Sequence, residues 1–468
     1  MRFVADLHLH SKYSMAVSPK MTLPFMAQYA AQKGIDIISA SDFTHPVWFK
    51  EIREQLIEAE EGIYKLRGES SELRNAKETL FLLSTEIASI YKQDGKVRRV
   101  HNLIFVPSLE VADKVNRELV ARGCNIMADG RPIVGISSRN LLEMILTIDE
   151  RCMLIPCHIW TPHFGVYGSA SGFDSLEQAY GDLASYIYGI ETGISSDPGM
   201  NWEVKELRNR SILSFSDAHS APKMGREATV FELEEPSYGS IREAIMLPSV
   251  IASDLREPGN LIVDGIASSH TPRNDVNKIA YTIEFYPEEG KYHFSGHRNC
   301  KVSIGPEEIR GGGNTCPVCK RRMTEGVLYR VQQLVDESLF NRVEEKVDEH
   351  GVKWYEDKLG EQPPFVKLVP LLEVVAQGIG STIASQKSQT MLAELCSQFG
   401  NEIEVLLEAS LEDITKVGGE FVAEAAKKVR EGNISIIPGY DGEYGKVSIW
   451  DEEERPKRTR GTKILKHR

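Results

Sequence analysis

The sequence is poor in cysteine and contains no long apolar segment. Seven cysteines among 468 residues are too few for a scaffold that disulfides hold together. A membrane-spanning helix needs about 18 or more consecutive apolar residues, and the chain has no such run. The first ten residues, MRFVADLHLH, carry an acid and two histidines where a secretory signal peptide has its apolar core. These absences predict a cytoplasmic protein that does not enter a membrane.

Positive charge is also in short supply. The formal net charge is −13, which excludes a surface that is basic all over, although a local basic patch could still bind nucleic acid. Hydrophobic residues make up 41% of the chain and charged residues 26%, as in ordinary globular proteins. A chain of this length predicts about two to four structural units.

One pattern recurs through residues 1–250. A short apolar run ends in an acid or a histidine, and a stretch of helical periodicity follows. Residues that end or border such runs are Asp6, Asp42, Glu86, His101, His158, Glu191 and Asp217. Short buried strands that alternate with helices predict an α/β fold with parallel strands. About seven such units favour a closed, distorted (β/α)7 barrel over residues 1–255, with an open sheet as the alternative, and place the chemistry at the strand carboxyl ends.

The chain changes character outside this pattern. The charged segment 51–77 predicts a solvated helix inserted between two strands. Residues 256–330 are rich in turns and hold the cluster of cysteines, which predicts a small zinc-binding module. Helical periodicity at 331–349 and 371–432 predicts an all-α, DNA-binding domain over residues 331–440. Residues 441–468 end in lysines and arginines and predict a basic tail.

Two histidines two residues apart mark the first candidate site. His8 and His10 point to the same face of an extended strand, and Asp6 lies on that face too. Incidental histidines would explain this pair alone, but similar residues recur at later strand ends. We therefore predict that these residues converge on metal ions. The predicted ligands are His8, His10, Asp42, His45, Glu86, His101, His158, Asp217 and His219.

This set predicts two or three catalytic divalent metals. Imidazole and carboxylate ligands fit zinc, manganese, iron or magnesium better than calcium. Glu86 and Asp217 are the candidates for bridging two metals. Metals about 4 Å apart activate water for attack at phosphorus, so we predict phosphoester hydrolysis with Asp217, Glu86 and His158 as catalytic residues. The chain has no GxSxG or Walker A sequence that would indicate another chemistry.

Together these residues resemble the motifs of the polymerase and histidinol phosphatase (PHP) superfamily over residues 1–250. The resemblance implies a distorted (β/α)7 barrel with three metals. The implied first metal is held by His8, His10, Glu86 and Asp217, the second by Glu86, His101 and His158, and the third by His219 with Asp42 or His45. The chain departs from the family at the third metal. Many members have Asp-His where Asp42-Phe43 stands, and a histidine where Ser14 or Met15 stands.

The second candidate site is a structural zinc site. His297 and Cys300 form one closely spaced pair and Cys316 and Cys319 another, and this spacing is typical of a zinc ribbon. His293 is an alternative to His297, and a set of buried thiols is the alternative to a metal site. The run Lys320, Arg321 and Arg322 follows directly, and either contacts DNA phosphates or forms a plain solvated surface.

A helical hairpin is the third candidate. Ser410 begins a short helix, Val417-Gly418-Gly419 forms a tight turn, and residues 421–429 form a second helix. Glycines such as Gly418 and Gly419 let a phosphate backbone approach main-chain N–H groups. The segment resembles a helix-hairpin-helix that binds DNA, with an ordinary pair of helices as the alternative.

The order of all these features resembles the endonuclease Q family. The resemblance rests on GHRNC at 296–300, the CPVC sequence at 316–319, LVPL at 368–371 and GYDGEYG at 439–445. It implies a DNA repair endonuclease that cuts double-stranded DNA on the 5′ side of uracil, hypoxanthine, xanthine or an abasic site. The residues predicted to line a pocket for the damaged base are Trp160, Phe164, Tyr167 and Ser196, with plain core packing as the alternative for each.

Two other functions remain as alternatives. One is a PHP-type phosphatase that acts on a small phosphomonoester, and the other is a DNA-binding scaffold with a degenerate barrel. A sliding clamp is a further candidate partner, although the tail lacks a clamp motif that begins with glutamine.

Overall fold

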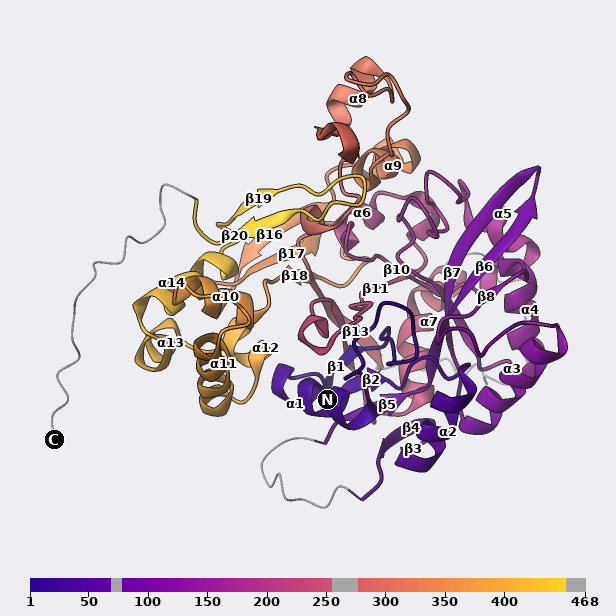
Figure 1. Ribbon diagram of the computed structural model, residues 1–468, viewed down its shortest axis with the longest axis horizontal. Helices are drawn as coiled ribbons and strands as arrows, with labels where there is room; N and C mark the ends of the chain where they lie inside the picture. Colours follow the sequence, from indigo (N-terminus) through magenta and orange to yellow (C-terminus); the bar gives the residue numbers. More distant parts are fainter. Residues whose placement is uncertain (69–77, 255–276, 452–468) are drawn as a thin grey trace, which may run out of the picture.

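The computed structural model describes residues 1–68, 78–254 and 277–451. A mixed α/β body holds the amino-terminal half, and a group of helices lies beside it near the carboxyl end (Figure 1). This confirms the predicted α/β fold with a carboxyl-terminal helical region. None of the helices in these ranges is both long and apolar enough to cross a membrane.

A ten-stranded sheet runs through both halves of the chain, in the order β16-β17-β18-β13-β12-β1-β2-β5-β4-β3. Its strands are β1 (Arg2–Asp6), β2 (Ile37–Ser39), β3 (Leu56–Glu60), β4 (Ile63–Leu66), β5 (Leu80–Leu82), β12 (Ala228–Glu232), β13 (Lys278–Glu284), β16 (Val343–Val347), β17 (Lys353–Asp357) and β18 (Phe365–Lys367). Strands β1, β2 and β5 are parallel neighbours, and β12 pairs antiparallel with both β1 and β13. The carboxyl-terminal half thus continues the amino-terminal sheet.

A second sheet carries part of the candidate site. It contains β6 (Ser84–Gln93), β7 (Lys96–Phe105), β8 (Ile133–Val134) and β9 (Met153–Pro156), in the order β8-β6-β7-β9. The long strands β6 and β7 form an antiparallel hairpin. Strands β10 (Gly189–Glu191) and β11 (Ser211–Leu213) form a separate parallel pair.

Helices cover these sheets with their apolar faces. They are α1 (Leu23–Lys33), α2 (Pro46–Gln55), α3 (Leu109–Ala121), α4 (Ser138–Ile148), α5 (Leu176–Tyr180), α6 (Pro198–Trp202) and α7 (Tyr238–Asp254). Helix α3 shows why such segments fold as they do. The Ser108 hydroxyl accepts the Val111 N–H at its start, and Val111, Val115 and Leu119 recur every four residues on its buried face.

The carboxyl-terminal helices have their own apolar core. They are α10 (Leu371–Gly378), α11 (Gln386–Phe399), α12 (Glu402–Leu407), α13 (Leu411–Gly418) and α14 (Glu420–Arg430). This core includes Val374, Leu395 and Val422, and it continues onto Val230 of β12 and Ile283 of β13. The helical region therefore packs directly on the main sheet. The hairpin of β19 (Ser435–Ile437) and β20 (Lys446–Ser448) follows it.

A small module projects from the main body. It contains β14 (Ser295–His297), β15 (Val302–Ile304), α8 (Pro306–Gly312) and α9 (Val327–Leu334), and α8 lies at the top of Figure 1. Its own buried core consists of only Ile309, Cys316 and Met323. Such a core is small for an independent fold.

Several predicted elements differ from the structure. A helix was predicted over 51–77, but α2 ends at Gln55 and the strands β3 and β4 follow. Residues 69–77 lie outside the described ranges. The helix predicted over 331–349 is split between α9 and the strand β16, and the region 331–440, predicted to be all-α, also contributes β17 and β18 to the ten-stranded sheet. Strands β6 and β7 are antiparallel, not successive parallel units, and the strand pairs form separate sheets. A closed seven-stranded barrel therefore stays a prediction, as do the domain boundaries, one of which falls in the undescribed segment 255–276.

Candidate metal centres

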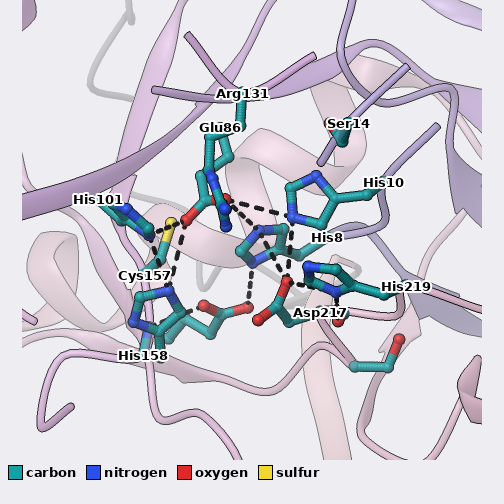
Figure 2. A network of polar contacts seen from close by, with 12 residues as sticks. His8, His10, Ser14, Glu86, His101, Arg131, Cys157, His158, Asp217 and His219 are labelled. Atoms are coloured by element: carbon teal, nitrogen blue, oxygen red, sulfur yellow. Dashed lines mark hydrogen bonds and ion pairs between the residues drawn. The ribbon is translucent and has the colours of Figure 1, made fainter. Parts of the chain in front are cut away.

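A first ligand group collects residues from distant parts of the chain (Figure 2). It contains His8, His10, Glu86 and Asp217, whose ligand atoms lie within 4.8 Å of one another. His10 Nε2 lies 3.0 Å from Asp217 Oδ1 and 3.2 Å from Glu86 Oε2. His8 Nε2 lies 3.6 Å from the same Glu86 oxygen. Three of these side chains are fully buried and that of Asp217 is 30% exposed, so the group is open to solvent on the Asp217 side.

Strand geometry brings these residues together. His8 follows β1 and Asp217 follows β11, so both extend beyond strand carboxyl ends. Glu86 on β6 pairs with Leu103 on β7. His101 stands two residues before Leu103 and therefore shares its face of the hairpin as a diagonal neighbour of Glu86.

Glu86 also belongs to a second group, with His101 and His158. Its Oε1 atom contacts His101 Nδ1 and lies 3.3 Å from His158 Nε2, and these two imidazole nitrogens are 3.3 Å apart. The two oxygens of Glu86 therefore face different groups. A carboxylate that bridges two neighbouring metals needs this arrangement.

The electrostatics of the site keep the carboxylates ionised. Burial raises the pKa of Glu86, but its interactions with His101 and Arg131 outweigh burial and hold the pKa well below its usual value. Burial also opposes ionisation of Asp217, and the hydrogen bond from His10 and the charge of His8 nevertheless lower its pKa. Burial lowers the pKa of His101 to about 4 despite the nearby Glu86. A neutral His101 beside an ionised Glu86 is the state in which these two side chains bind a cation.

An unsatisfied nitrogen atom indicates a missing partner at the first group. His8 Nε2 is buried, and it has no hydrogen-bond partner among the residues that the structure describes. Buried polar atoms are rarely left without a partner. The chemistry of the group, imidazole nitrogen beside carboxylate oxygen, fits zinc, manganese or iron. The residues present thus fit divalent metals.

Two further carboxylates contact the Nδ1 atoms of His8 and His10, away from the Nε2 atoms that belong to the first ligand group. His8 Nδ1 lies 2.8 Å from one oxygen of Glu191, and the other oxygen accepts the backbone N–H of His158 at 2.8 Å. His10 Nδ1 lies 3.2 Å from Asp42, which also accepts the backbone N–H of Ser11. Such contacts fix which ring nitrogen faces the metal. Glu191 was visible as the end of a strand, but its contact with His8 spans 183 residues and no local pattern indicates it.

Three predicted ligands lie outside the two groups. Asp42 stands behind His10. His45 caps the start of α2, where its ring accepts the Trp48 N–H and stacks on Tyr13 with 4.5 Å between ring centroids. His219 packs against His10 with 4.7 Å between centroids and contacts the backbone oxygen of Asp217. The assignment of a third metal to His219 with Asp42 or His45 therefore stays a prediction.

A further cluster of possible ligands has a different composition. It contains His8, Cys157 and Glu191. Burial raises the pKa of the Cys157 thiol well above its usual value, so the thiol stays protonated and is a poor metal ligand. Its sulfur faces the backbone oxygen of Ile155. This cluster is better explained as the support of His8.

Arg131 was not predicted as a site residue. It comes from the loop between α3 and β8, and its Nη1 atom lies 3.2 Å from Glu86 Oε2. Its side chain is 25% exposed, so the guanidinium lies between the ligand cluster and solvent. A single arginine in a loop gives no sequence signal of such a position.

The backbone is strained at three site residues. Asp42, His158 and Asp217 have φ angles of 42°, 29° and 47°, a left-handed region that costs such residues about 1–3 kcal/mol each. A Cβ atom at Gly193 would lie 2.4 Å from the His158 Cβ, so the turn that supports His158 accepts only glycine there. Strain of this kind persists where the surrounding structure imposes it and is common at functional sites.

The residues predicted to line a base pocket are mostly in the core. Trp160, Tyr167 and Ser196 are buried, and Trp160 Nε1 donates to Asn201 while the Tyr167 hydroxyl donates to Glu206. Phe164 is partly exposed and packs against His101 with 4.4 Å between centroids. Of the four residues, Phe164 is the one whose position allows contact with a ligand at the second metal group.

The cysteine module contains a separate ligand group. His297, Cys300, Cys316 and Cys319 lie together as predicted, and Cys319 Sγ lies 3.3 Å from His297 Nδ1. The backbone N–H of Cys319 is the largest factor that lowers the pKa of Cys316, to about 6, which favours the thiolate that binds metal. His293, the alternative ligand, instead contacts the backbone oxygen of Ser195. Three thiols and one imidazole fit a structural zinc.

The residues predicted to contact DNA lie on the surface. Lys320, Arg321 and Arg322 are exposed beside the cysteine group. Gly418 ends α13 and Gly419 precedes α14 with a φ of 85°, and a Cβ at Gly419 would meet nothing within 4 Å. The predicted pair of helices is confirmed, and its role in DNA binding stays a prediction. Residues 452–468 of the predicted basic tail lie outside the described ranges.

Relatives of known sequence resemble parts or all of the chain. Residues 370–433 match the family described as the MJ0043 C-terminal domain. The uncharacterized protein MJ0043 of Methanocaldococcus jannaschii is 30% identical over 308 residues, which cover 63% of this chain and 32% of that protein. The chain therefore spans about a third of the length of that relative. The uncharacterized protein YqxK of Bacillus subtilis is 26% identical over 464 residues, or 95% of this chain and 99% of that protein.

Two solved structures resemble nearly the whole chain. The lesion-specific endonuclease PfuEndoQ from Pyrococcus furiosus is 28% identical, with a TM-score of 0.74 over 98% of each chain. Endonuclease Q bound to a 27-mer duplex with an abasic lesion at its active site is 29% identical, with a TM-score of 0.76 over 98% of this chain and 99% of that one. The resemblance to endonuclease Q is thus confirmed.

Proposed function

We propose that the chain is a metal-dependent DNA repair endonuclease that hydrolyses the phosphodiester on the 5′ side of a deaminated base or an abasic site. The main support is a combination of two observations. Two neighbouring groups of possible metal ligands, which share Glu86, lie together in the structure, and the chain resembles endonuclease Q over nearly its whole length. One of those relatives holds a duplex with an abasic lesion at its active site. A phosphatase for small phosphomonoesters would have no use for the cysteine module and the carboxyl-terminal helices.

Each site residue has a defined task in this proposal. His8, His10, Glu86 and Asp217 hold one divalent metal, and Glu86, His101 and His158 hold a second. The metals supply Lewis-acid stabilisation of the phosphate oxygens and lower the pKa of water. Glu191 and Asp42 keep the imidazoles oriented, and Arg131 offers its guanidinium donors to a non-bridging phosphate oxygen.

The remaining parts bind the duplex. The exposed Lys320, Arg321 and Arg322 attract phosphates, and the turn at Gly418 and Gly419 lets the DNA backbone approach main-chain N–H groups. A structural zinc in the cysteine module keeps the basic run in place. The damaged nucleotide leaves the base stack to reach the ligand cluster, which costs less for a mispaired or missing base. Uracil, hypoxanthine and xanthine mispair, which is why we include them with abasic sites.

A duplex that contains one deoxyuridine tests the proposal. We expect the metal-loaded protein to cut the uracil strand once, at the phosphodiester 5′ of the lesion, and to leave the undamaged duplex intact. A chelator should abolish the cut, and an added divalent metal should restore it. Turnover of a phosphomonoester such as p-nitrophenyl phosphate without any cutting of damaged duplexes would favour the phosphatase instead.

A further inference from the structure

The loop between β19 and β20, residues 438–445, is built as a rigid support. Its glycines donate backbone hydrogen bonds to the segment before the cysteine module: Gly439 to Glu288 at 2.7 Å, Gly442 to Lys291 at 2.9 Å and Gly445 to Glu289 at 2.9 Å. A Cβ atom at Gly439 would lie 2.4 Å from the Gly290 oxygen, and one at Gly445 would lie 2.2 Å from the Glu288 oxygen. Only glycine permits this close approach of two backbones.

A carboxylate fixes the same loop to the cysteine module. Asp441 accepts the Arg298 backbone N–H at 2.7 Å and the Thr324 hydroxyl. Arg298 lies between two of the predicted zinc ligands, His297 and Cys300. The loop therefore keeps a constant position relative to this module, and its outward side chains are held in place.

One of those outward side chains is an aromatic ring with two ammonium groups near it. Tyr444 is 51% exposed. The Nζ atoms of Lys291 and Lys223 lie 4.5 and 5.4 Å from the centre of its ring. In the part of the chain that the structure describes, no carboxylate lies within ion-pair distance of either ammonium group, so both are available to an anion.

Two segments connect the group of Tyr444, Lys223 and Lys291 with the candidate catalytic cluster along the chain. Lys223 stands four residues after His219, on the loop that also carries Asp217. Tyr292, next to Lys291, packs edge-on against His163 with 6.5 Å between ring centroids. His163 in turn stands five residues after His158. The loop after β11 thus contacts Tyr444 through Lys223, and the loop after β9 reaches Tyr292, the neighbour of Lys291.

We propose that Tyr444, Lys223 and Lys291 form a docking site for one unstacked nucleotide of the DNA strand beside the cut. The base stacks on the exposed face of Tyr444, and the two ammonium groups bind the phosphates on either side of it. An aromatic ring can stack on a base whose face is open, as it is next to a nucleotide that has left the stack. The proposal rests on the DNA endonuclease function above.

The test is a fluorescence titration with the metal-loaded full chain. The probe is a duplex with one abasic site, 2-aminopurine as the neighbouring base, and a non-hydrolysable methylphosphonate at the linkage to be cut. Stacking on Tyr444 should quench the 2-aminopurine of the bound duplex. We expect Tyr444→Ala to lose this quenching and to weaken binding about tenfold, which is the scale of one base–aromatic stack, whereas Tyr444→Trp retains both.

The lysines should act through charge alone. Lys223→Ala and Lys291→Ala should each lower the slope of affinity against salt concentration by about one and leave the quenching in place. The matched control is Tyr186→Ala, at an exposed tyrosine (44%) that ends the 3-10 helix Gly181–Tyr186, which should bind and quench as the original chain does.

The outcomes separate this inference from the proposed function. Equal quenching and equal affinity in Tyr444→Ala and the original chain would overturn the docking site while the endonuclease proposal stands. If the original chain neither binds nor cuts abasic duplexes, the endonuclease proposal itself fails. Metal content equal to that of the original chain shows that each variant is folded.

Discussion

The two candidate metal centres of this chain are built in opposite ways. The buried cluster draws its ligands from residues 8 to 217, and a large apolar core surrounds it. The cysteine group draws its ligands from residues 297 to 319, around a core of three buried residues. In the first centre the fold positions the ligands, and in the second the ligands hold the fold. Loss of metal should therefore abolish chemistry at one centre and local structure at the other.

The largest effect is expected at the buried cluster. Asp217→Asn should lower the rate of cutting at least about a thousandfold, because a metal supplies several kcal/mol to phosphoryl transfer. The fold should survive, since Asp217 is the partly exposed member of the group. Single-turnover cutting of an abasic duplex and thermal unfolding measure the two effects.

A matched control sharpens this prediction. Asp182→Asn changes an exposed aspartate that pairs with Arg139 on the surface, and it should cut at the original rate. Unchanged cutting by Asp217→Asn would remove Asp217 from the catalytic machinery.

The cysteine group should show the opposite behaviour. Cys316→Ser should lower the zinc content by about one ion per chain, since four ligands hold one structural zinc, and should expose residues 295–324 to amide hydrogen exchange. The sheet and the carboxyl-terminal helices should keep their protection, because their cores lie elsewhere. Cys124→Ser, at a cysteine outside the group, is the control. Uniform loss of protection over the whole chain would contradict a separate module.

A smaller effect is expected for the basic run beside this module. Replacing Lys320, Arg321 and Arg322 together with alanine should weaken binding to damaged and undamaged duplexes alike, and the salt slope should fall by up to about three. The control replaces Lys114 and Arg117 of α3 and Arg122 directly after it, whose charges pair with acids of that helix. An unchanged salt slope in the first variant would make the run a plain solvated surface.

The smallest effect concerns Glu289, a buried acid at which the charge of Arg226 does not outweigh burial. Burial raises the pKa of Glu289 to about 8, whereas at Glu86 the interactions with His101 and Arg131 outweigh burial. The raised pKa means that the folded state holds a proton more tightly than the unfolded state does. This contribution to stability is present below the ordinary pKa near 4.5 and is lost as pH rises through about 8.

Substitution of this acid isolates the effect. Glu289→Gln should raise the Tm at pH 8–9 by a few degrees, roughly the shift that 1–2 kcal/mol produces, with little change at pH 4. Thermal unfolding over this pH range measures it. A difference between the two chains that does not vary with pH would show that Glu289 does not titrate in this window.

The sequence allowed most of the buried cluster to be predicted. His8, His10 and Asp217 follow apolar runs, and the structure places them at strand ends that converge. Glu191 and Arg131 could not be predicted in their observed contacts, because these contacts join segments with no common pattern. The ligands assigned to a third metal followed the family motif, and the sequence departs from that motif at Phe43 and at Ser14 or Met15, which belong to this third metal site.

Strand direction was the main failure for the fold. The apolar runs of β6 and β7 show that strands exist but carry no information on whether they are parallel. A signal was present at Asp94-Gly95, where both residues have positive φ angles of 52° and 74°, the backbone of a tight antiparallel hairpin turn. The charged segment 56–66 was likewise predicted to be a helix. It forms a β-hairpin with one face exposed to solvent, and the acids on that face obscure the alternation of apolar and polar residues that is typical of strands.

Anomalous X-ray scattering from crystals of the purified protein tests the central claim most directly. Data on both sides of the zinc, manganese and iron edges locate each metal and identify it. We expect a peak enclosed by His8, His10, Glu86 and Asp217, a second beside His101 and His158, and a zinc peak within the cysteine group. A zinc peak at the cysteines with no metal at the buried cluster, in a protein that cuts damaged DNA, would contradict the account.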